Sequence, residues 1–477
     1  MLGRVFKAYD IRGTYPDLLN ETLAWQIGYG TSKFLRGEAA AVGDTTPMMR
    51  NIIVGRDMRR SSPSLASEVI AGITDQGGDV IDVGLVDTPF IYFAINHLDC
   101  AGGVMTTASH NPPNYNGFKI SKRKAKPVGE ATGLSDIRKF AAMVERATVQ
   151  KAGGRVHQRD LWEPYKAHVL NFLDMSAFKA SKPLRVVVDA SNAMAGLVVP
   201  KIFGKKGEGV PGLEIIEVNY DYSTGSFAHE PNPLVAYNLR HVQAAVLELK
   251  ADFGICFDGD ADRLVIVDEK SQIIGCDHLT AFLAKSFLAK HPGSSIVYDL
   301  RSSKAVEEEV RKAGGTPVRS RVGHVFMKAK MAETGAAFGG ELSGHFYFRD
   351  NFFADSGVIA MAVTLSAIAR TGKRVSDIFK PLARYVQSGE INFRIEEKDA
   401  AIEELRSELE GTGHIDELDG LSIDAFDREG WWMNVRKSNT EPLLRLNAEA
   451  RDIRTLERVV SRVSPILGAR VEQEQQH

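Results

Sequence analysis

The feature that most constrains the fold of this sequence is a strand, turn, helix and strand pattern that occurs three times. Residues 51–84 begin with a β-branched run, continue through polar turn residues into a helical pattern, and end in glycines and a second apolar run. Residues 184–219 and 294–323 repeat this order. Parallel strands need a long connection, which a helix usually supplies. Because the copies start more than 100 residues apart, the pattern predicts three related α/β domains rather than a solenoid.

The C-terminal part of the chain has a different pattern. Residues 390–397 and 420–438 read as strands joined by turns, and residues 452–467 read as a closing amphipathic helix. A small α+β domain fits this order. Turn-rich and polar stretches then place the predicted domains at residues 1–157, 158–252, 253–372 and 373–477.

Composition excludes several classes of protein. The 477 residues contain 44% hydrophobic and 25% charged side chains with a formal net charge of −2, so neither nucleic acid nor a membrane is an expected partner. Three dispersed cysteines do not make a disulfide framework, and a reducing cytoplasm is expected. The N-terminus lacks the apolar core of a signal peptide, and no apolar run is long enough to span a bilayer.

The first candidate site is the segment from Thr106 to Lys119, which contains Ser109. The apolar run before it reads as a strand, and the NPPNYNG stretch after it is a turn, because proline fixes φ and asparagine and glycine accept unusual backbone angles. Ser109 is therefore expected on a loop at a strand end, where open α/β sheets bind ligands. A local hydrogen-bonding role is the alternative. The neighbours Thr107 and Asn111 exclude the nucleophile elbow of α/β hydrolases.

The second candidate site is the segment DGDADR, which contains Asp258, Asp260 and Asp262 between two apolar runs. Carboxylates at alternate positions can converge on one hard cation where the backbone turns, and they repel each other without it. A charged β-turn is the structural alternative. An EF-hand is excluded because its sixth position is Arg263 instead of glycine and its flanks read as strands. A phosphatase with an aspartyl nucleophile remains a second enzymatic interpretation.

The third candidate site is the segment GGELSGH, residues 339–345. Glu341, Ser343 and His345 alternate, so an extended backbone presents them on one side, where carboxylate and hydroxyl groups can bind sugar hydroxyls. A bulge at a strand edge is the alternative interpretation.

The fourth candidate site is the segment RKSNTEPLLR, which runs from Arg436 to Arg445. Arg436 offers a bidentate fork for phosphate, short polar donors follow it, and a turn here would point main-chain N–H groups at an anion. A solvated turn before Pro442 is the alternative. Two weaker candidates are Arg12, which could approach a phosphate, and His324, which lies between a predicted strand and a predicted helix.

Together, the motifs TASHNP…NGFK, DGDADR, GGELSGH and RKSNTEP resemble those of the α-D-phosphohexomutase family, in the same order and over essentially the whole chain. Leu342, after the glutamate of the third motif, points to the phosphomannomutase/phosphoglucomutase branch, since phosphoglucosamine mutases usually carry glutamine there. The resemblance implies four domains around a central cleft. One departure is Arg301, where some relatives have a lysine, and no role is carried over to it.

The resemblance also implies roles for individual residues. Ser109 resembles the phosphoserine that donates and recovers the phosphoryl group, and with Asp258, Asp260 and Asp262 it resembles the ligand set of Mg²⁺. The groups that resemble catalytic residues around the transferring phosphate are His110, Lys119, Arg263, Arg12 and His324. The groups that resemble substrate-binding residues are Glu341, Ser343, His345, Arg436, Ser438, Asn439, Thr440 and Arg445.

The implied reaction interconverts hexose 6-phosphate and hexose 1-phosphate, of mannose or glucose or both. A hexose 1,6-bisphosphate is the implied intermediate and activator, Mg²⁺ the implied cofactor, and a cytoplasmic monomer or weak homodimer the implied form. Three alternatives stay open: a Mg²⁺-dependent sugar phosphatase, a phosphoglucosamine mutase, and a sugar-phosphate sensor without activity.

Overall fold

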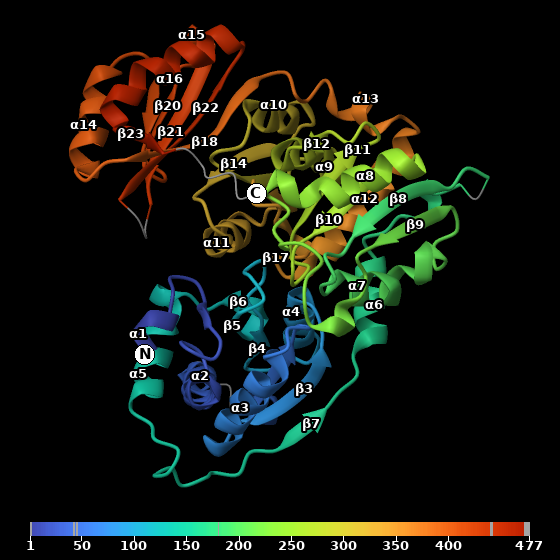
Figure 1. Ribbon diagram of the computed structural model, residues 1–477, viewed down its shortest axis with the longest axis vertical. Helices are drawn as coiled ribbons and strands as arrows, with labels where there is room; N and C mark the ends of the chain where they lie inside the picture. Colours follow the sequence, from blue (N-terminus) through green and yellow to red (C-terminus); the bar gives the residue numbers. More distant parts are fainter. Residues whose placement is uncertain (1, 42, 44–45, 180, 439–441, 472–477) are drawn as a thin grey trace. The chain divides into compact units, whose positions relative to one another are not determined.

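The structure is a computed structural model that describes residues 2–41, 43, 46–179, 181–438 and 442–471. The chain forms two compact units, of which the first contains Met1–Gly275 and Ser343–Ser376 and the second contains Cys276–Leu342 and Asp377–His477. Unit 1 contains two sheets and one further pair of strands, unit 2 contains two groups of paired strands, and each unit is described separately (Figure 1).

The first sheet of unit 1 has the strand order β1-β5-β4-β2-β3-β7, with β6 beside β5. Strands β4, β2, β3 and β7 are parallel. Strand β5 pairs antiparallel with β4, and β1 pairs antiparallel with β5. Their bounds are β1 (Ile11–Thr14), β2 (Asn51–Arg56), β3 (Asp79–Leu85), β4 (Gly102–Thr106), β5 (Tyr115–Lys122), β6 (Lys126–Pro127) and β7 (Val156–Gln158).

Helices cover both faces of this sheet, because its central strands are apolar on both sides. Ile52 and Val54 of β2 belong to a core shared with the helices α2, α3 and α5. Ile53, on the opposite face, lies with Ile91 and Ile95 of α4 around Gly103. The helices are α1 (Leu2–Val5), α2 (Glu21–Ala41), α3 (Ser62–Asp75), α4 (Thr88–His97) and α5 (Leu134–Ala142).

Two glycines let α2 and α3 pack closely. A Cβ atom on Gly28 would lie 2.3 Å from the carbonyl oxygen of Val69, and one on Gly72 would lie 2.1 Å from that of Trp25. Contacts this short are not found for real side chains, so each helix places a glycine where the backbone of the other passes.

The change Gly72→Ala is therefore expected to lower the free energy of unfolding by about 1–3 kcal/mol, because overpacking outweighs the gain of about 1 kcal/mol in helix propensity. Gly37→Ala is the matched control, since Gly37 lies in α2, the helix that packs against α3, and its Cβ would meet no described atom within 4 Å. That control should be neutral or slightly stabilising. Urea denaturation of both variants measures the difference, and equal stabilities would refute the packing argument.

The second sheet of unit 1 has the strand order β12-β11-β10-β8-β9. Strands β8, β9 and β10 are parallel, whereas β10 and β11 form an antiparallel hairpin whose strand residues are all buried. The elements are α6 (Trp162–Leu170), β8 (Leu184–Asp189), α7 (Ala195–Phe203), β9 (Leu213–Val218), α8 (Arg240–Leu249), β10 (Phe253–Phe257), β11 (Leu264–Asp268) and β12 (Ile273–Ile274). The boundary predicted at residue 252 falls inside this sheet, because β10 pairs with β8.

Residues 343–376 complete unit 1 with β16 (Phe346–Phe348), β17 (Ala354–Asp355) and α12 (Gly357–Thr371). The two strands are antiparallel. Nearly every residue of α12 is buried, and the helix contacts α6, α7 and β11. The return of the chain therefore places GGELSGH residues beyond Leu342 in the same unit as the DGDADR segment.

Unit 2 begins with the third repeat, in the parallel strand order β14-β13-β15. Its elements are α9 (Cys276–Lys290), β13 (Ser295–Asp299), α10 (Lys304–Lys312), β14 (Thr316–Ser320), α11 (His324–Thr334) and β15 (Phe338–Gly340). A helix α13 (Val375–Phe379) starts in unit 1 and ends in unit 2.

The last sheet of unit 2 is antiparallel, with the strand order β19-β20-β21-β22-β18-β23. Its elements are β18 (Val386–Arg394), α14 (Lys398–Glu408), β19 (His414–Asp416), β20 (Leu421–Asp424), α15 (Phe426–Glu429), β21 (Trp431–Lys437), β22 (Leu443–Ala450), α16 (Ile453–Leu467) and β23 (Ala469–Val471). Helices α14 and α16 contribute to its core, together with alternate residues of the strands. The predicted fold class, three α/β domains and a C-terminal α+β domain, is confirmed.

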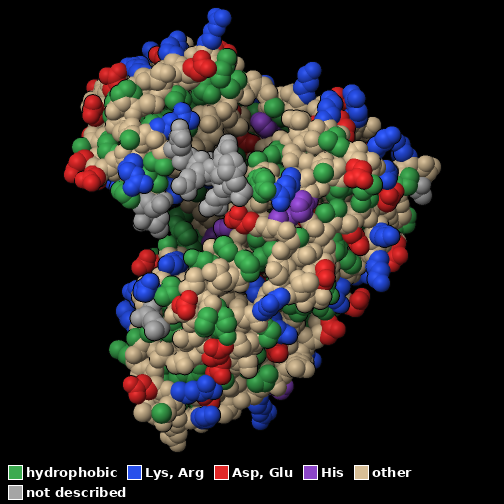
Figure 2. All heavy atoms as spheres, in the orientation of Figure 1, with side chains coloured by type: hydrophobic (Ala, Val, Ile, Leu, Met, Phe, Trp, Pro, Cys, Tyr) green, Lys and Arg blue, Asp and Glu red, His purple; other side chains and the backbone are tan. Residues whose placement is uncertain are grey.

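Charged side chains of both signs are interspersed over the molecular face drawn in Figure 2, in agreement with the small net charge. None of the described helices combines the length and the apolar character that crossing a membrane requires.

Candidate active site

Ser109 lies at the carboxyl end of β4 and is completely buried. Its φ of 49° places it in the left-handed region, which a serine rarely adopts and which often marks a functional position. Its hydroxyl donates to Oδ2 of Asp258 at 2.9 Å and lies 3.3 Å from Nδ1 of His110. The turn predicted around Ser109 therefore points a hydroxyl at the second motif, 149 residues further along the chain.

The three aspartates of that motif lie in the loop between β10 and β11, and all are buried. One carboxylate oxygen from each lies within 4.8 Å of the others. Oδ1 of Asp260 is buried and has no hydrogen-bond partner among the described residues. Three close carboxylates with an unsatisfied oxygen suit a hard divalent cation, which prefers oxygen ligands.

Lys119 supplies a positive charge to this cluster in the structure. Its ammonium group, carried by β5, lies 2.6 Å from Oδ2 of both Asp260 and Asp262. Burial alone would lower the pKa of Lys119, but the two aspartates outweigh burial and raise it, so the side chain is an ammonium ion at neutral pH. Burial raises the pKa of Asp258 well above its usual range, and the nearby charges of Asp262 and Asp260 raise it further.

Arg263 and His345 extend the cluster. The main-chain N–H of Arg263 donates to Asp258 at 3.2 Å, and its Nε donates to Nε2 of His345 at 3.2 Å. Nδ1 of His345 lies 2.8 Å from the hydroxyl of Ser343, and Nε2 lies 3.5 Å from Asp262. Of the three alternating residues predicted in GGELSGH, His345 thus lies beside Asp262, and Ser343 contacts His345.

Arg12 and His110 also contact the segment around Ser109. Arg12 forms an ion pair with Asp10 at 2.7 Å and donates to Asn111 and to the carbonyl oxygen of Ala108. Burial, with the charges of Arg263 and Arg12, lowers the pKa of His110 to about 2. The imidazole of His110 is therefore neutral at physiological pH, with one ring nitrogen that donates a hydrogen bond and one that accepts.

Arg59 is a central residue of the site that the sequence analysis missed. Its side chain is buried, and its Nε lies 3.2 Å from Asp57. Its two Nη atoms donate at 2.6–3.1 Å to four main-chain carbonyls, those of Ser109, Asn111, Pro112 and Tyr115. A guanidinium group can make such a set of bonds because its donors are fixed in a plane. The arginine therefore holds the turn that carries Ser109.

Thr88 and Gly259 position the aspartate loop and were also missed. The N–H of Thr88 donates to the carbonyl of Asp260 at 3.1 Å, and its hydroxyl donates to the Asp260 carboxylate. A Cβ atom on Gly259 would lie 2.3 Å from the carbonyl oxygen of Ser109, so only glycine lets the two loops approach this closely. The signals in the sequence are a Thr-Pro pair after an apolar run and a glycine between two aspartates, and both are weak alone.

Glu341 and His324 lie in unit 2. Glu341 is buried directly after β15, and its Oε1 accepts the N–H of Gly323 at 3.0 Å. His324 follows that glycine as the first residue of α11. These two predicted residues are therefore neighbours within their unit.

The predicted phosphate-binding arginines also lie in unit 2, where they share one carboxylate. Nη2 of Arg436 lies 2.5 Å from Glu390, and Nη1 of Arg445 lies 3.4 Å from it. Arg301, for which no role was predicted, lies 3.6 Å from the same carboxylate and also pairs with Asp299. Ser438 lies beside Arg445 at 3.5 Å, whereas Asn439 and Thr440 lie outside the described residues. Burial and the charge of Arg301 lower the pKa of Arg436.

The fold and the site define a multidomain α/β enzyme with a buried serine set against a cluster of three carboxylates. Four family models cover the chain in order: phosphoglucomutase/phosphomannomutase alpha/beta/alpha domain I at residues 3–147, domain II at 163–272, domain III at 276–385 and the C-terminal domain at 390–466. The chain belongs to the phosphoglucomutase/phosphomannomutase family.

Individual relatives agree with this assignment. A phosphomannomutase of Salmonella montevideo is 37% identical, over 97% of this chain and 99% of the relative. A protein of Xanthomonas campestris pv. campestris named phosphohexose mutases is 39% identical, over 97% and 98%. A family member from Burkholderia thailandensis has a solved structure with a TM-score of 0.84 and 30% identity, covering 97% of this chain and 96% of that one. The protein is accordingly a phosphohexomutase.

Proposed function

We propose that the protein interconverts the 6-phosphate and 1-phosphate of mannose, glucose or both, through phospho-Ser109 and a hexose 1,6-bisphosphate intermediate. The observation that supports this best is the buried Ser109 hydroxyl, 2.9 Å from one of three clustered carboxylates. A serine in that place is suited to carry a phosphoryl group, because the nearby Lys119, Arg12 and Arg263 can offset the charge of the phosphate. A phosphatase with an aspartyl nucleophile would not explain why the Ser109 hydroxyl points at the aspartate cluster.

The reaction consists of two phosphoryl transfers. In the first, the bond between phosphorus and Oγ of Ser109 breaks while a bond to the free sugar hydroxyl forms, and the proton lost by that hydroxyl is balanced by the proton that Oγ gains. The imidazole of His110 lies 3.3 Å from Oγ and can hydrogen-bond to the reacting oxygen during this transfer, but its pKa of about 2 makes it too weak a base to keep the proton. In the second, the other phosphate of the bisphosphate returns to Ser109. Arg12, Arg263 and Lys119 supply positive charge around the transferring group.

Asp258, Asp260 and Asp262 would hold Mg²⁺ together with an oxygen on Ser109, because they offer clustered oxygen ligands, two of which have no hydrogen-bond partner among the described residues. When bound, Mg²⁺ supplies charge compensation for the phosphoryl oxygens. A distant structural relative, the N-acetylphosphoglucosamine mutase of Aspergillus fumigatus, was crystallised with GlcNAc-6P and magnesium.

The remaining predicted residues are assigned to substrate binding. Glu341, Ser343 and His345 would bind sugar hydroxyls, with His324 beside Glu341. The phosphate that does not react would bind to the arginines around Glu390 and to the segment of Ser438, Asn439 and Thr440. Because Arg301 lies in the same cluster, we add it to this group.

Arg436→Ala is expected to raise KM for the hexose phosphate by about 10-fold or more, because it removes a bidentate fork for the phosphate that does not react. Arg458→Ala is the control, since this arginine of α16 is exposed and belongs to none of the predicted site segments. Steady-state kinetics of both variants measure the difference. An unchanged KM in the Arg436 variant would place the phosphate clamp elsewhere.

The function is tested by comparing kcat/KM for mannose 1-phosphate, glucose 1-phosphate and glucosamine 1-phosphate, each with a trace of the matching 1,6-bisphosphate. We expect turnover of mannose or glucose phosphate and a phosphoserine at position 109 in the peptide mass spectrum. Release of inorganic phosphate without isomerised sugar would support the phosphatase, and a preference for glucosamine 1-phosphate would support that mutase instead.

A further inference from the structure

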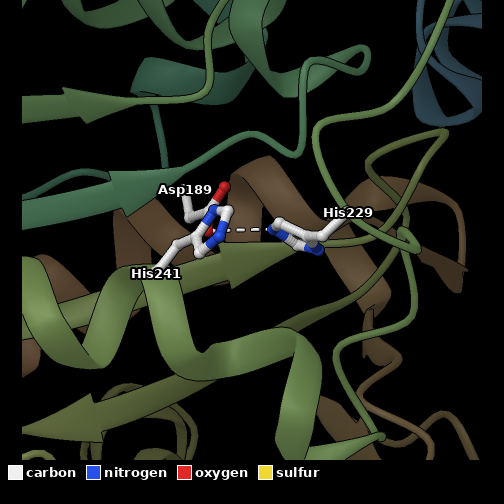
Figure 3. Close-up of side chains that lie close together, drawn as sticks. All are labelled: Asp189, His229 and His241. Carbon is white, nitrogen blue, oxygen red and sulfur yellow. Dashed lines mark hydrogen bonds and ion pairs between the residues drawn. The ribbon is translucent and has the colours of Figure 1, made fainter. Parts of the chain in front are cut away.

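A second cluster of potential metal ligands lies in unit 1, among residues that the proposed reaction does not use. Asp189 ends β8, His229 lies in the loop between β9 and α8, and His241 is the second residue of α8. Figure 3 shows the three side chains converging from these separate segments. One ligand atom from each lies within 4.8 Å of the others. The cluster is at the carboxyl end of a central parallel strand, where open α/β sheets bind ligands.

The orientation of His229 is fixed by both of its ring nitrogens. Nδ1 lies 2.9 Å from the carbonyl oxygen of Glu230, and Nε2 lies 3.0 Å from Oδ2 of Asp189. A carbonyl oxygen only accepts, so Nδ1 carries the proton, and in the neutral ring Nε2 presents a lone pair to the carboxylate. Two lone pairs face each other there unless a cation lies with them, either a further proton or a metal ion.

The surroundings resemble those that orient metal ligands. Oδ1 of Asp189 accepts from the N–H of Ser191 and from Nδ2 of Asn219, both at 2.9 Å, which turns Oδ2 toward His229. Nδ2 of Asn219 also lies 2.9 Å from Nδ1 of His241. Asp189 is completely buried and the His229 side chain is 4% exposed. Hydrogen bonds from main-chain and amide groups to the ligands are the usual outer support of a metal site.

We propose that Asp189, His229 and His241 bind one divalent transition-metal ion of the Zn²⁺ class. Two imidazoles and one carboxylate suit Zn²⁺ and Co²⁺, whereas Mg²⁺ prefers the all-carboxylate cluster of Ser109. Three protein ligands leave a position for water. The bond to the ion would replace the hydrogen bond between Asn219 and His241. This site is independent of the proposed function, because none of its residues belongs to the phosphoryl-transfer cluster.

Such an ion would join the end of β8, the 225–235 loop and the start of α8. The same region supports the aspartate loop: the N–H of Met194 donates to the carbonyl of Gly259 at 3.2 Å, and the hydroxyl of Ser191 lies 3.4 Å from the carbonyl of Phe257. Metal binding to the folded chain should therefore stabilise it and raise Tm by about 2–5 °C at saturating ion.

The test is a titration of the chelator-treated full chain with Co²⁺ in excess Mg²⁺, followed by the visible absorption of Co²⁺ and by Tm. We expect one ion per chain and a rise in Tm. His229→Asn and His241→Gln should each weaken binding at least 10-fold, while His157→Gln, a change in an exposed histidine of β7, and Asp258→Asn should not.

His241→Gln keeps the contact between His229 and Asp189, so it carries the test if the His229 variant does not fold. Wild-type protein without Co²⁺ absorption and without a Tm shift would overturn the proposal and leave an aspartate–histidine hydrogen-bond network. Binding that is unchanged in the folded His241 variant would overturn it as well, because the ion would then lie at another site.

Discussion

Replacing Ser109 by alanine should reduce mutase turnover by on the order of 10³-fold or more, because no oxygen remains to carry the phosphoryl group. The fold should persist. Alanine fills less volume than serine, and the left-handed backbone at this position is no more strained for alanine than for serine. The lost hydrogen bond to Asp258 leaves a carboxylate that still contacts Arg263.

Ser121→Ala is the matched control, since Ser121 is another buried serine on the strand that carries Lys119. It should retain turnover and incorporate one phosphoryl group from the bisphosphate, which the Ser109 variant should not. A coupled assay measures turnover, and intact-protein mass spectrometry measures incorporation. Near-native turnover in a folded Ser109 variant would remove the basis of the phosphoserine proposal.

Arg59→Lys should lower kcat about 10²-fold, since a small displacement of the serine loop is costly for a reaction that needs aligned atoms. An ammonium group cannot reproduce the planar set of bonds to four carbonyls around Ser109. We choose lysine over alanine because it keeps a positive charge next to the buried Asp57. Loss of bonds from a charged donor should also lower the free energy of unfolding by about 2–4 kcal/mol.

Arg60→Lys separates this effect from a general loss of arginine. Arg60 is the next residue along the chain, is exposed, and donates from Nε to the carbonyl of Thr224 at 3.1 Å. Its variant should keep kcat and Tm close to those of the wild type. A folded Arg59 variant with unchanged kcat would show that the serine loop keeps its geometry without the guanidinium clamp, and Arg59 would then be a structural residue alone.

Much of the fold could be predicted because its signals are local. Apolar runs of strand length, helical periodicity and turn residues recur within each of the three repeats, and the structure has β2–α3–β3, β8–α7–β9 and β13–α10–β14 at those places. The expectation that Ser109 follows a strand rested on the same kind of signal, because proline and asparagine define the turn after it.

The missed features depend on contacts between segments far apart in the sequence. Arg59 is 50 residues from Ser109, and Thr88 is 172 residues from Asp260, so no local pattern relates them. Arg301 and Arg436 likewise form ion pairs with the same residue, Glu390, and nothing in the predicted strand that contains Glu390 indicates this contact. The boundary at residue 252 followed polar composition before β10, but hydrogen bonding to β8 decides to which sheet that strand belongs.

Glu390 already pairs with three arginines, so the anion binding proposed for this cluster would displace the glutamate rather than fill an empty site. The carboxylate accepts a hydrogen bond from Arg436 and forms ion pairs with Arg301 and Arg445. An incoming anion must compete with it, and a dianion brings more charge and more acceptor oxygens than the carboxylate does. A neutral hydroxyl group is too weak an acceptor to displace the carboxylate of Glu390 from the arginines. Under the proposed function, the glutamate would therefore favour binding of a phosphorylated sugar over an unphosphorylated one.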